Sequence, residues 1–103
     1  MPRLDPLIEL QAWYAAQGNG CWEHQYGVKI DTIDNPGWSL KIDLYETDLS
    51  GRLFEDVDAG DQDGRDWYIC RVRDYKFESF CGPALLSDVI SVFLDWAEFR
   101  ASA

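Results

Sequence analysis

The stretch YGVKIDTIDNPGWSLKIDL, residues 26–44, consists of two runs in which apolar and polar side chains alternate. Successive side chains of a β-strand point to opposite faces, so a period of two is typical of a strand with one buried face. The positions expected to face the core are Val28, Ile30 and Thr32 in the first run and Trp38, Leu40, Ile42 and Leu44 in the second. The stretch therefore predicts a β-hairpin.

The turn of this hairpin is expected at Asp34-Asn35-Pro36-Gly37. Proline fixes φ early in the turn and glycine supplies a left-handed residue, as a three-residue loop with a bulge requires. With residues 35–37 as the loop, the expected pairs are Thr32 with Leu40 and Ile30 with Ile42 on the buried face, and Asp31 with Lys41 and Lys29 with Asp43 on the other. Each opposite-charge pair adds about 0.2–1 kcal/mol, whereas a shift of two residues would set Lys29 against Lys41.

A helix is predicted over residues 6–17, before the hairpin. Asp5 is a typical N-cap and Pro6 suits the first helical position. The apolar positions at helical spacing are Leu7, Leu10 and Tyr14. Gly18-Asn19-Gly20 ends the helix, because glycine and asparagine tolerate the left-handed conformation common at a helix terminus. A strand region is expected to follow.

Further strands are predicted at residues 53–57, 67–73 and 76–80, with an exposed acidic loop over residues 59–66. Gly82-Pro83 opens a second helix, which runs to about Phe99 with a wide apolar stripe. No crossover helix interrupts the strands, so the sequence predicts an α+β fold: an N-terminal helix, an antiparallel sheet of four or five strands and a C-terminal helix, with the helices packed on one sheet face. Residues 1–103 are expected to form one domain.

The composition is that of a folded protein with an acidic surface. Apolar residues make up 47% of the 103 residues and aromatic residues 15%, far from the composition of a disordered chain. The N-terminus lacks the apolar stretch of a signal peptide and no run is long enough to span a membrane, so a cytoplasmic protein is expected. The formal charge of -10 disfavours binding to nucleic acid or membrane phosphates and favours a basic protein as partner.

The aromatic residues also indicate a protein interface. Five tryptophans and five tyrosines exceed what one small core needs. Trp13, Trp38 and Trp96 fall on predicted core faces, which leaves Trp22 and Trp67 as candidates for exposure. Exposed aromatic side chains amid carboxylates are typical interface anchors. Alternatively, Trp22 only covers the edge of the sheet.

The three cysteines and the single histidine do not form a recognisable metal or catalytic motif. Cys21, Glu23 and His24 lie too close in sequence for a nucleophile and a base to orient each other, unless the chain turns sharply there. No CxxC pair is present, so neither a zinc site nor a disulfide framework is predicted. The loop over residues 59–64 resembles the start of a calcium loop but has Ala59 and Cys70 at the first and twelfth ligand positions. No cofactor is therefore predicted.

Cys81 supports an alternative, enzymatic hypothesis. It lies one or two residues before the predicted second helix, where backbone N–H groups and the helix dipole would lower the pKa of a thiol. The alternative is thus a small thiol-dependent enzyme of the sulfur-transfer type. No base is placed beside this thiol by the sequence, and Phe80 suggests that it is buried.

The block WEHQYGVKIDTIDNPGW, residues 22–38, resembles immunity protein family 53 of bacterial polymorphic toxin systems. The similarity extends to Trp13-Tyr14, to the KIDL of residues 41–44, and through residues 70–72 and 76–78 to Gly82-Pro83. It departs at residues 18–21, where Gly-Asn-Gly-Cys stands in place of Cys-Asp-Gly-Asp. This departure argues against Cys21 as a fixed ligand or nucleophile.

The resemblance implies a small cytoplasmic, non-enzymatic protein that binds and neutralises a cognate toxin domain. A basic toxin would suit the negative charge of this chain, because opposite charges steer association. The residues expected to bind the partner are Trp22, Glu23, His24 and Tyr26, together with Asp58, Asp61, Asp63 and Asp66 as an acidic steering loop.

Overall fold

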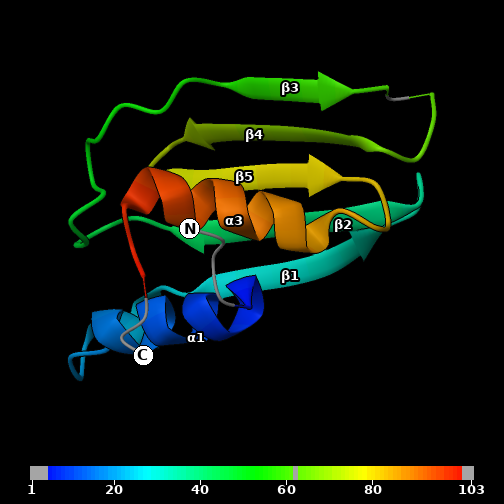
Figure 1. The fold of residues 1–103 in the computed structure, drawn as a ribbon. Helices are drawn as coiled ribbons and strands as arrows, with labels where there is room; N and C mark the ends of the chain where they lie inside the picture. Colours follow the sequence, from blue (N-terminus) through cyan, green and yellow to red (C-terminus); the bar gives the residue numbers. More distant parts are fainter. Residues whose placement is uncertain (1–4, 62, 101–103) are drawn as a thin grey trace.

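A computed structural model describes residues 5–61 and 63–100 of the chain. Five strands form one antiparallel sheet in the spatial order β1-β2-β5-β4-β3. The strands are β1 (Val28–Ile33), β2 (Gly37–Asp43), β3 (Val57–Gly60), β4 (Trp67–Arg73) and β5 (Lys76–Cys81), and the helices are α1 (Pro6–Gln17), α2 (Trp22–Gln25) and α3 (Leu86–Ala97). Helices α1 and α3 lie over the same face of the sheet (Figure 1). The predicted α+β fold is confirmed.

Helix α1 has the predicted bounds, but only part of the expected apolar face is buried. The Leu7 N–H donates to Asp5 Oδ1 at 2.9 Å, as expected of the N-cap. Leu10 and Trp13 are buried, and the ring of Trp13 meets that of Phe93 on α3 edge to face. Leu7 and Tyr14, expected in the core, are 48% and 41% exposed. The packing partner of α1 is α3, and the side facing α3 is buried.

The β1–β2 hairpin forms with a register two residues away from the predicted one. Lys29 lies opposite Lys41, Ile30 opposite Leu40, and Ile33 opposite Gly37. A shift of two keeps the same side chains on the buried face, so the apolar pattern could not distinguish the two registers. The charges of β2 face β5 as well as β1: Lys41 lies opposite Glu78, and Asp43 lies opposite Lys76 with its carboxylate 3.9 Å from the ammonium group, so β1 alone does not decide the register.

Gly37 explains where the turn ends. The loop is Asp34, Asn35 and Pro36, and Gly37 already belongs to β2. Its φ is not positive, contrary to the expectation of a left-handed residue. A Cβ atom at this position would instead collide with the carbonyl oxygen of Cys81. Glycine is required here by the close approach of two strands.

Residues 22–25 form the short helix α2, where a strand was expected. The side-chain oxygen of Asn19 accepts from the N–H groups of Cys21 and Trp22, at 2.9 and 3.0 Å. The carboxylate of Glu23 accepts from the N–H groups of Asn19 and Gly20. These bonds satisfy backbone donors before and at the start of the helix, so the chain turns sharply between α1 and β1.

The later elements agree with the sequence except at their ends. Strand β4 has the predicted bounds, and β5 is one residue longer than expected. Strand β3 begins at Val57, where the predicted strand at residues 53–57 was to end. Helix α3 begins at Leu86 instead of Gly82-Pro83, because the Gly82 N–H still bonds the Trp67 carbonyl oxygen at 2.9 Å.

Residues 44–56 connect β2 to β3 without a helix or strand, but several of their residues pack against or bond to the rest of the protein. Leu49 is buried, and the Phe54 ring packs edge to face against Phe77 and Trp96. The Trp96 indole donates to the Leu53 carbonyl oxygen at 2.8 Å, and the Arg52 guanidinium donates to the Trp96 carbonyl oxygen at 3.0 Å. This connection is thereby held against the C-terminal end of α3.

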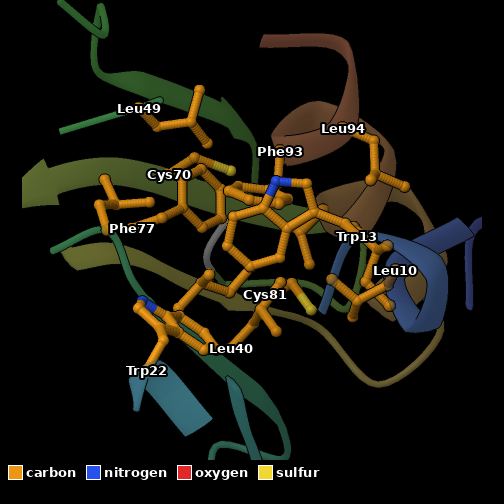
Figure 2. Packing of buried hydrophobic residues seen from close by; sticks show 14 residues of the cluster. Leu10, Trp13, Trp22, Leu40, Leu49, Cys70, Phe77, Cys81, Phe93 and Leu94 are labelled. Carbon is orange, nitrogen blue, oxygen red and sulfur yellow. The ribbon is translucent and has the colours of Figure 1, made fainter. Parts of the chain in front are cut away.

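The core lies between the helices and the sheet. Its fully buried side chains include Leu40 and Ile42 of β2, Phe77 of β5, and Ile90 and Phe93 of α3. Figure 2 shows Trp13, Trp22, Cys70 and Cys81 within the same cluster. The opposite face of the sheet has no helix over it in the described part of the chain (Figure 1).

Candidate partner-binding surfaces

Trp22 and Trp67, the two candidates for exposure, are both buried. Their exposed fractions are 2% and 5%. The Trp22 indole N–H donates to the carbonyl oxygen of Tyr45 at 2.8 Å, and its ring meets those of Trp13 and Tyr14 edge to face. The side chain of Trp22 is therefore satisfied inside the protein, and it positions its neighbours instead of offering a contact surface.

Glu23 and His24, on the same short helix, are exposed. The carboxylate of Glu23 is held by backbone donors. The N–H of Glu23 itself has the largest effect, and with those of Asn19 and Gly20 it outweighs the opposing effect of burial and lowers the pKa of Glu23. Glu23 therefore stabilises the turn before α2, whereas the side chain of His24, on the same helix, is exposed.

Tyr26, the fourth residue expected in this part of the site, belongs to a row of aromatic rings. Its ring stacks on that of Tyr45 with a centroid distance of 5.4 Å, and Tyr45 lies 4.8 Å from Tyr75. Tyr45 is 38% exposed and Tyr75 48%. We call these three side chains the tyrosine patch. It occupies the end of the sheet where β1 begins, β2 has just ended and β4 turns into β5.

The backbone around the tyrosine patch has an unusual conformation. Glu46, Asp74 and Tyr75 have positive φ values of 59°, 54° and 59°. Asp74 and Tyr75 form the two-residue turn between β4 and β5, at positions where asparagine and glycine are common. A left-handed tyrosine is unfavourable, and such strain often occurs at functional sites. Glu46 and Asp74 are exposed, so carboxylates flank the patch.

Sequence reasoning missed Tyr45 and Tyr75. Tyr45 follows the alternating run of the hairpin by one residue, and its role depends on a carbonyl contact with Trp22 that no local pattern records. Tyr75 did carry a signal. The pair Asp74-Tyr75 separates two predicted strands by two residues, so a type of turn that requires positive φ was foreseeable there.

The four predicted carboxylates of the acidic loop are all exposed but do not form one cluster. Asp58 lies on β3, opposite Ile69, on the sheet face without helices. Asp61, Asp63 and Asp66 lie in the connection from β3 to β4, where Asp61 Oδ1 accepts from the Asp63 N–H at 2.9 Å. These three side chains surround the turn, and we call them the acidic turn.

The acidic turn and the tyrosine patch lie at opposite ends of the sheet. Gly60 pairs with Trp67 beside the acidic turn, in the same part of the sheet as Trp38 and Cys81. Tyr26 precedes β1 at the other end, where the Gly27 N–H bonds the carboxylate of Asp43. Strand β1 alone spans about 16 Å at 3.3 Å per residue. Tyr26 and the three carboxylates of the acidic turn, all predicted to contact the partner, therefore lie at opposite ends of the sheet.

Cys81 lacks the environment that the enzymatic hypothesis requires. It ends β5, is fully buried, and is separated from the start of α3 by four residues. Burial raises the pKa of the Cys81 thiol to about 11, although a backbone hydrogen bond from Trp38 opposes the shift. Burial likewise raises the pKa of Cys70. Both thiols point into the core (Figure 2), so the predicted pKa depression at Cys81 is wrong.

The described residues contain no group of three or more histidine, cysteine, aspartate or glutamate side chains placed to hold a metal ion. Within the same residues, no helix has the length and hydropathy needed to cross a membrane. The site geometry thus consists of two exposed surfaces, one aromatic and one acidic, around a buried core.

The family model described as immunity protein 53 matches residues 7–98, nearly the whole chain. The chain belongs to the immunity protein 53 family. The match spans every helix and strand except Pro6 at the start of α1, so it includes both the tyrosine patch and the acidic turn. Comparison with curated proteins and with solved structures gave no match. Membership in an immunity protein family implies a toxin as the partner.

Proposed function

We propose that this protein binds a cognate toxin domain in the cytoplasm of the producing cell and neutralises it without catalysing a reaction. Membership in the immunity protein 53 family supports this function. The buried state of Cys81 removes the main argument for the enzymatic alternative. What the geometry adds is a specific hypothesis about which surface contacts the toxin.

The tyrosine patch is the surface that we propose as the main contact. Tyrosine buries a large area at a small loss of side-chain entropy, and for this reason it is common at the centre of interfaces. Tyr45 and Tyr75 are both more than one-third exposed although their rings lie 4.8 Å apart. The single observation that carries the proposal is the left-handed Tyr75, which keeps an aromatic ring at a turn position that favours glycine.

The partner surface should carry arginine or lysine. Glu46 and Asp74 flank the patch, and both side chains are exposed. A guanidinium group can stack on a tyrosine ring and donate to a neighbouring carboxylate at the same time. A basic toxin surface, as expected from the charge of -10, would satisfy both requirements.

The acidic turn has a different proposed role. Asp61, Asp63 and Asp66 are exposed at the other end of the sheet, so one compact toxin surface need not touch both regions. Electrostatic attraction acts over about 8 Å at physiological salt and raises the rate of encounter without a direct contact. We therefore assign the acidic turn to steering and the tyrosine patch to binding, with Glu23 and His24 at the border of the patch.

The first experiment is a neutralisation assay with the toxin domain encoded beside this gene. Cells that express the toxin alone should stop growing, and cells that also express this protein should grow and yield a stoichiometric complex. The double variant Tyr45→Ala/Tyr75→Ala should fold but fail to rescue growth. Continued toxicity with the wild-type protein would refute the proposed function, whereas rescue by the double variant would refute only the proposed surface.

A further inference from the structure

The two edges of the sheet differ in a way that bears on self-association. Strand β3, at one edge, has four residues, carries the exposed Asp58 and leads into the acidic turn. Strand β1, at the other edge, has six residues and carries Lys29 and Asp31 on its outer face. Like charges protect an edge from pairing with a copy of itself. That protection is present at β3 and absent at β1.

The side to which each backbone N–H and C=O group of β1 points follows from the first hydrogen bond between β1 and β2. The Asp43 N–H donates to the Gly27 carbonyl oxygen at 3.0 Å, so the backbone groups of Gly27 face β2. Along an antiparallel strand, the backbone N–H and C=O groups of successive residues point alternately toward and away from the neighbouring strand. The backbone groups of Val28, Ile30 and Thr32 therefore point away from β2. No strand among the described residues pairs with this side of β1.

The side chains of two residues whose backbone groups point away from β2 line an apolar groove. Val28 and Ile30 line a cavity of about 310 Å³ together with Leu7 and Tyr14 of α1. Leu7, Tyr14 and Ile30 are each more than one-third exposed. An exposed edge strand next to exposed apolar side chains is a template for the addition of another strand.

The charges of β1 are complementary to β1 itself. In an antiparallel pair of two β1 strands centred on Ile30, each Lys29 lies opposite Asp31 of the second copy, and Val28 lies opposite Thr32. The paired backbone groups are those of Val28, Ile30 and Thr32, which are the groups that face outward. A shift of two residues in either direction sets Lys29 against Lys29 or Asp31 against Asp31. Only one register satisfies both the hydrogen bonds and the charges.

We infer that this protein forms a homodimer in which the β1 strands of two copies pair antiparallel about Ile30, joining the two sheets into one. The two-fold symmetry makes the contact self-complementary. The pair also places the Ile30 side chains against each other over the groove beside α1. This inference does not depend on the identity of the toxin, because the tyrosine patch and the β1 edge are tested by different variants.

The test is the mass of the purified protein in solution. Light scattering or sedimentation over a wide concentration range should give a species of twice the 11.9 kDa chain mass. Lys29→Asp and Asp31→Lys should each give a monomer, because each change sets like charges against each other. The double variant Lys29→Asp/Asp31→Lys should again give the dimer, since the exchanged charges remain complementary. Asp58→Lys, at the other edge, is the matched control and should leave the dimer intact.

Circular dichroism establishes that each variant is folded, so loss of the dimer cannot be confused with loss of the fold. In the wild-type protein, the amide protons of Ile30 and Thr32 should exchange more slowly as the concentration rises. A wild-type monomer at every concentration would overturn the inference, as would a folded double variant that stays monomeric. Protection of these amides by the toxin alone would also overturn it and assign the edge to the toxin.

Discussion

The indole N–H of Trp22 donates a 2.8 Å hydrogen bond to the carbonyl oxygen of Tyr45, which lies 23 residues later in the chain. Trp22 is 2% exposed and Tyr45 is 38% exposed. A buried residue of α2 thereby fixes the backbone of an exposed residue in the tyrosine patch. Trp22, in the segment that resembles the immunity protein family, therefore contributes to the proposed contact surface indirectly, because it positions Tyr45 from inside the protein.

We expect Trp22→Phe to destabilise the fold by about 1–3 kcal/mol, because it removes the bond to Tyr45 and leaves a cavity beside Trp13. The measurement is urea unfolding followed by circular dichroism. His24→Ala, on the same short helix but exposed, should change the free energy of unfolding by less than about 0.5 kcal/mol. Equal stability of Trp22→Phe and the wild type would show that the indole bond contributes nothing.

Tyr75→Gly is expected to weaken the binding of the toxin while leaving the stability of the fold nearly unchanged. Glycine relieves a left-handed tyrosine, a gain of about 1 kcal/mol, while the loss of the ring contact with Tyr45 costs about 0.5–1.5 kcal/mol. The melting temperature should therefore stay within about 4 °C of the wild type. Toxin affinity should fall at least about tenfold, as measured by calorimetry.

The matched control for Tyr75→Gly is Tyr14→Ala, which removes a tyrosine of similar exposure from α1. Its toxin affinity should equal that of the wild type within about twofold. If both variants bind as tightly as the wild type, the tyrosine patch is not the contact. If Tyr14→Ala alone weakens binding, the contact lies over α1 instead.

The acidic turn should govern the rate of association. The triple variant Asp61→Asn/Asp63→Asn/Asp66→Asn should bind the toxin several-fold more slowly at low salt, with an unchanged dissociation rate, because electrostatic steering acts on encounter. Stopped-flow fluorescence at several salt concentrations measures both rates. The variant Asp34→Asn/Asp48→Asn/Asp88→Asn removes the same net charge elsewhere. An equal effect of the two triple variants would mean that net charge, and not the acidic turn, steers the toxin.

The thiols should differ in reactivity according to burial. In the native protein at neutral pH, iodoacetamide should modify Cys21, which is exposed, and leave Cys70 and Cys81 unmodified. Mass spectrometry after digestion identifies the sites, and modification of all three cysteines in urea is the control. Rapid native modification of Cys81 at neutral pH would contradict its raised pKa and restore the enzymatic hypothesis.

The raised pKa of Cys81 also makes stability depend on pH. The thiol ionises near pH 9 in the unfolded chain and at about 11 in the folded protein. The contribution to stability is therefore fully present below pH 9 and decreases as the pH rises from about 9 to about 11, because only the unfolded state loses a proton there. Urea midpoints across this range should fall less steeply in Cys81→Ala than in the wild type.

The helices and strands whose bounds depend on nearby residues could be predicted from the sequence. Helix α1 and strand β4 have the predicted bounds because their caps and alternation lie within the elements themselves. The hairpin register could not be obtained from β1 and β2 alone, since the charge opposite Lys41 comes from Glu78 on β5. Likewise, the requirement for Gly37 comes from Cys81, a residue 44 positions later.

The candidate site was harder to predict than the fold. An exposed residue was expected at Trp22, but α2 turns this side chain into the core, because Asn19 and Glu23 hold the chain in a sharp turn. The exposed aromatic surface is formed instead by Tyr26, Tyr45 and Tyr75, which meet only when three connections reach the same end of the sheet. Exposure of an aromatic residue is thus a tertiary property, whereas the acidic character of the connection at residues 61–66 is visible in the sequence.

The reciprocal bonds between residues 52–53 and Trp96 have a consequence for recognition. A connection of thirteen residues without regular structure would ordinarily move freely in the unbound protein and would have to be immobilised by a partner. Here the indole and guanidinium bonds, with buried Leu49, hold residues 44–56 in place before any partner arrives. The toxin would then meet a surface whose conformational entropy was already lost during folding, and association would require little further ordering.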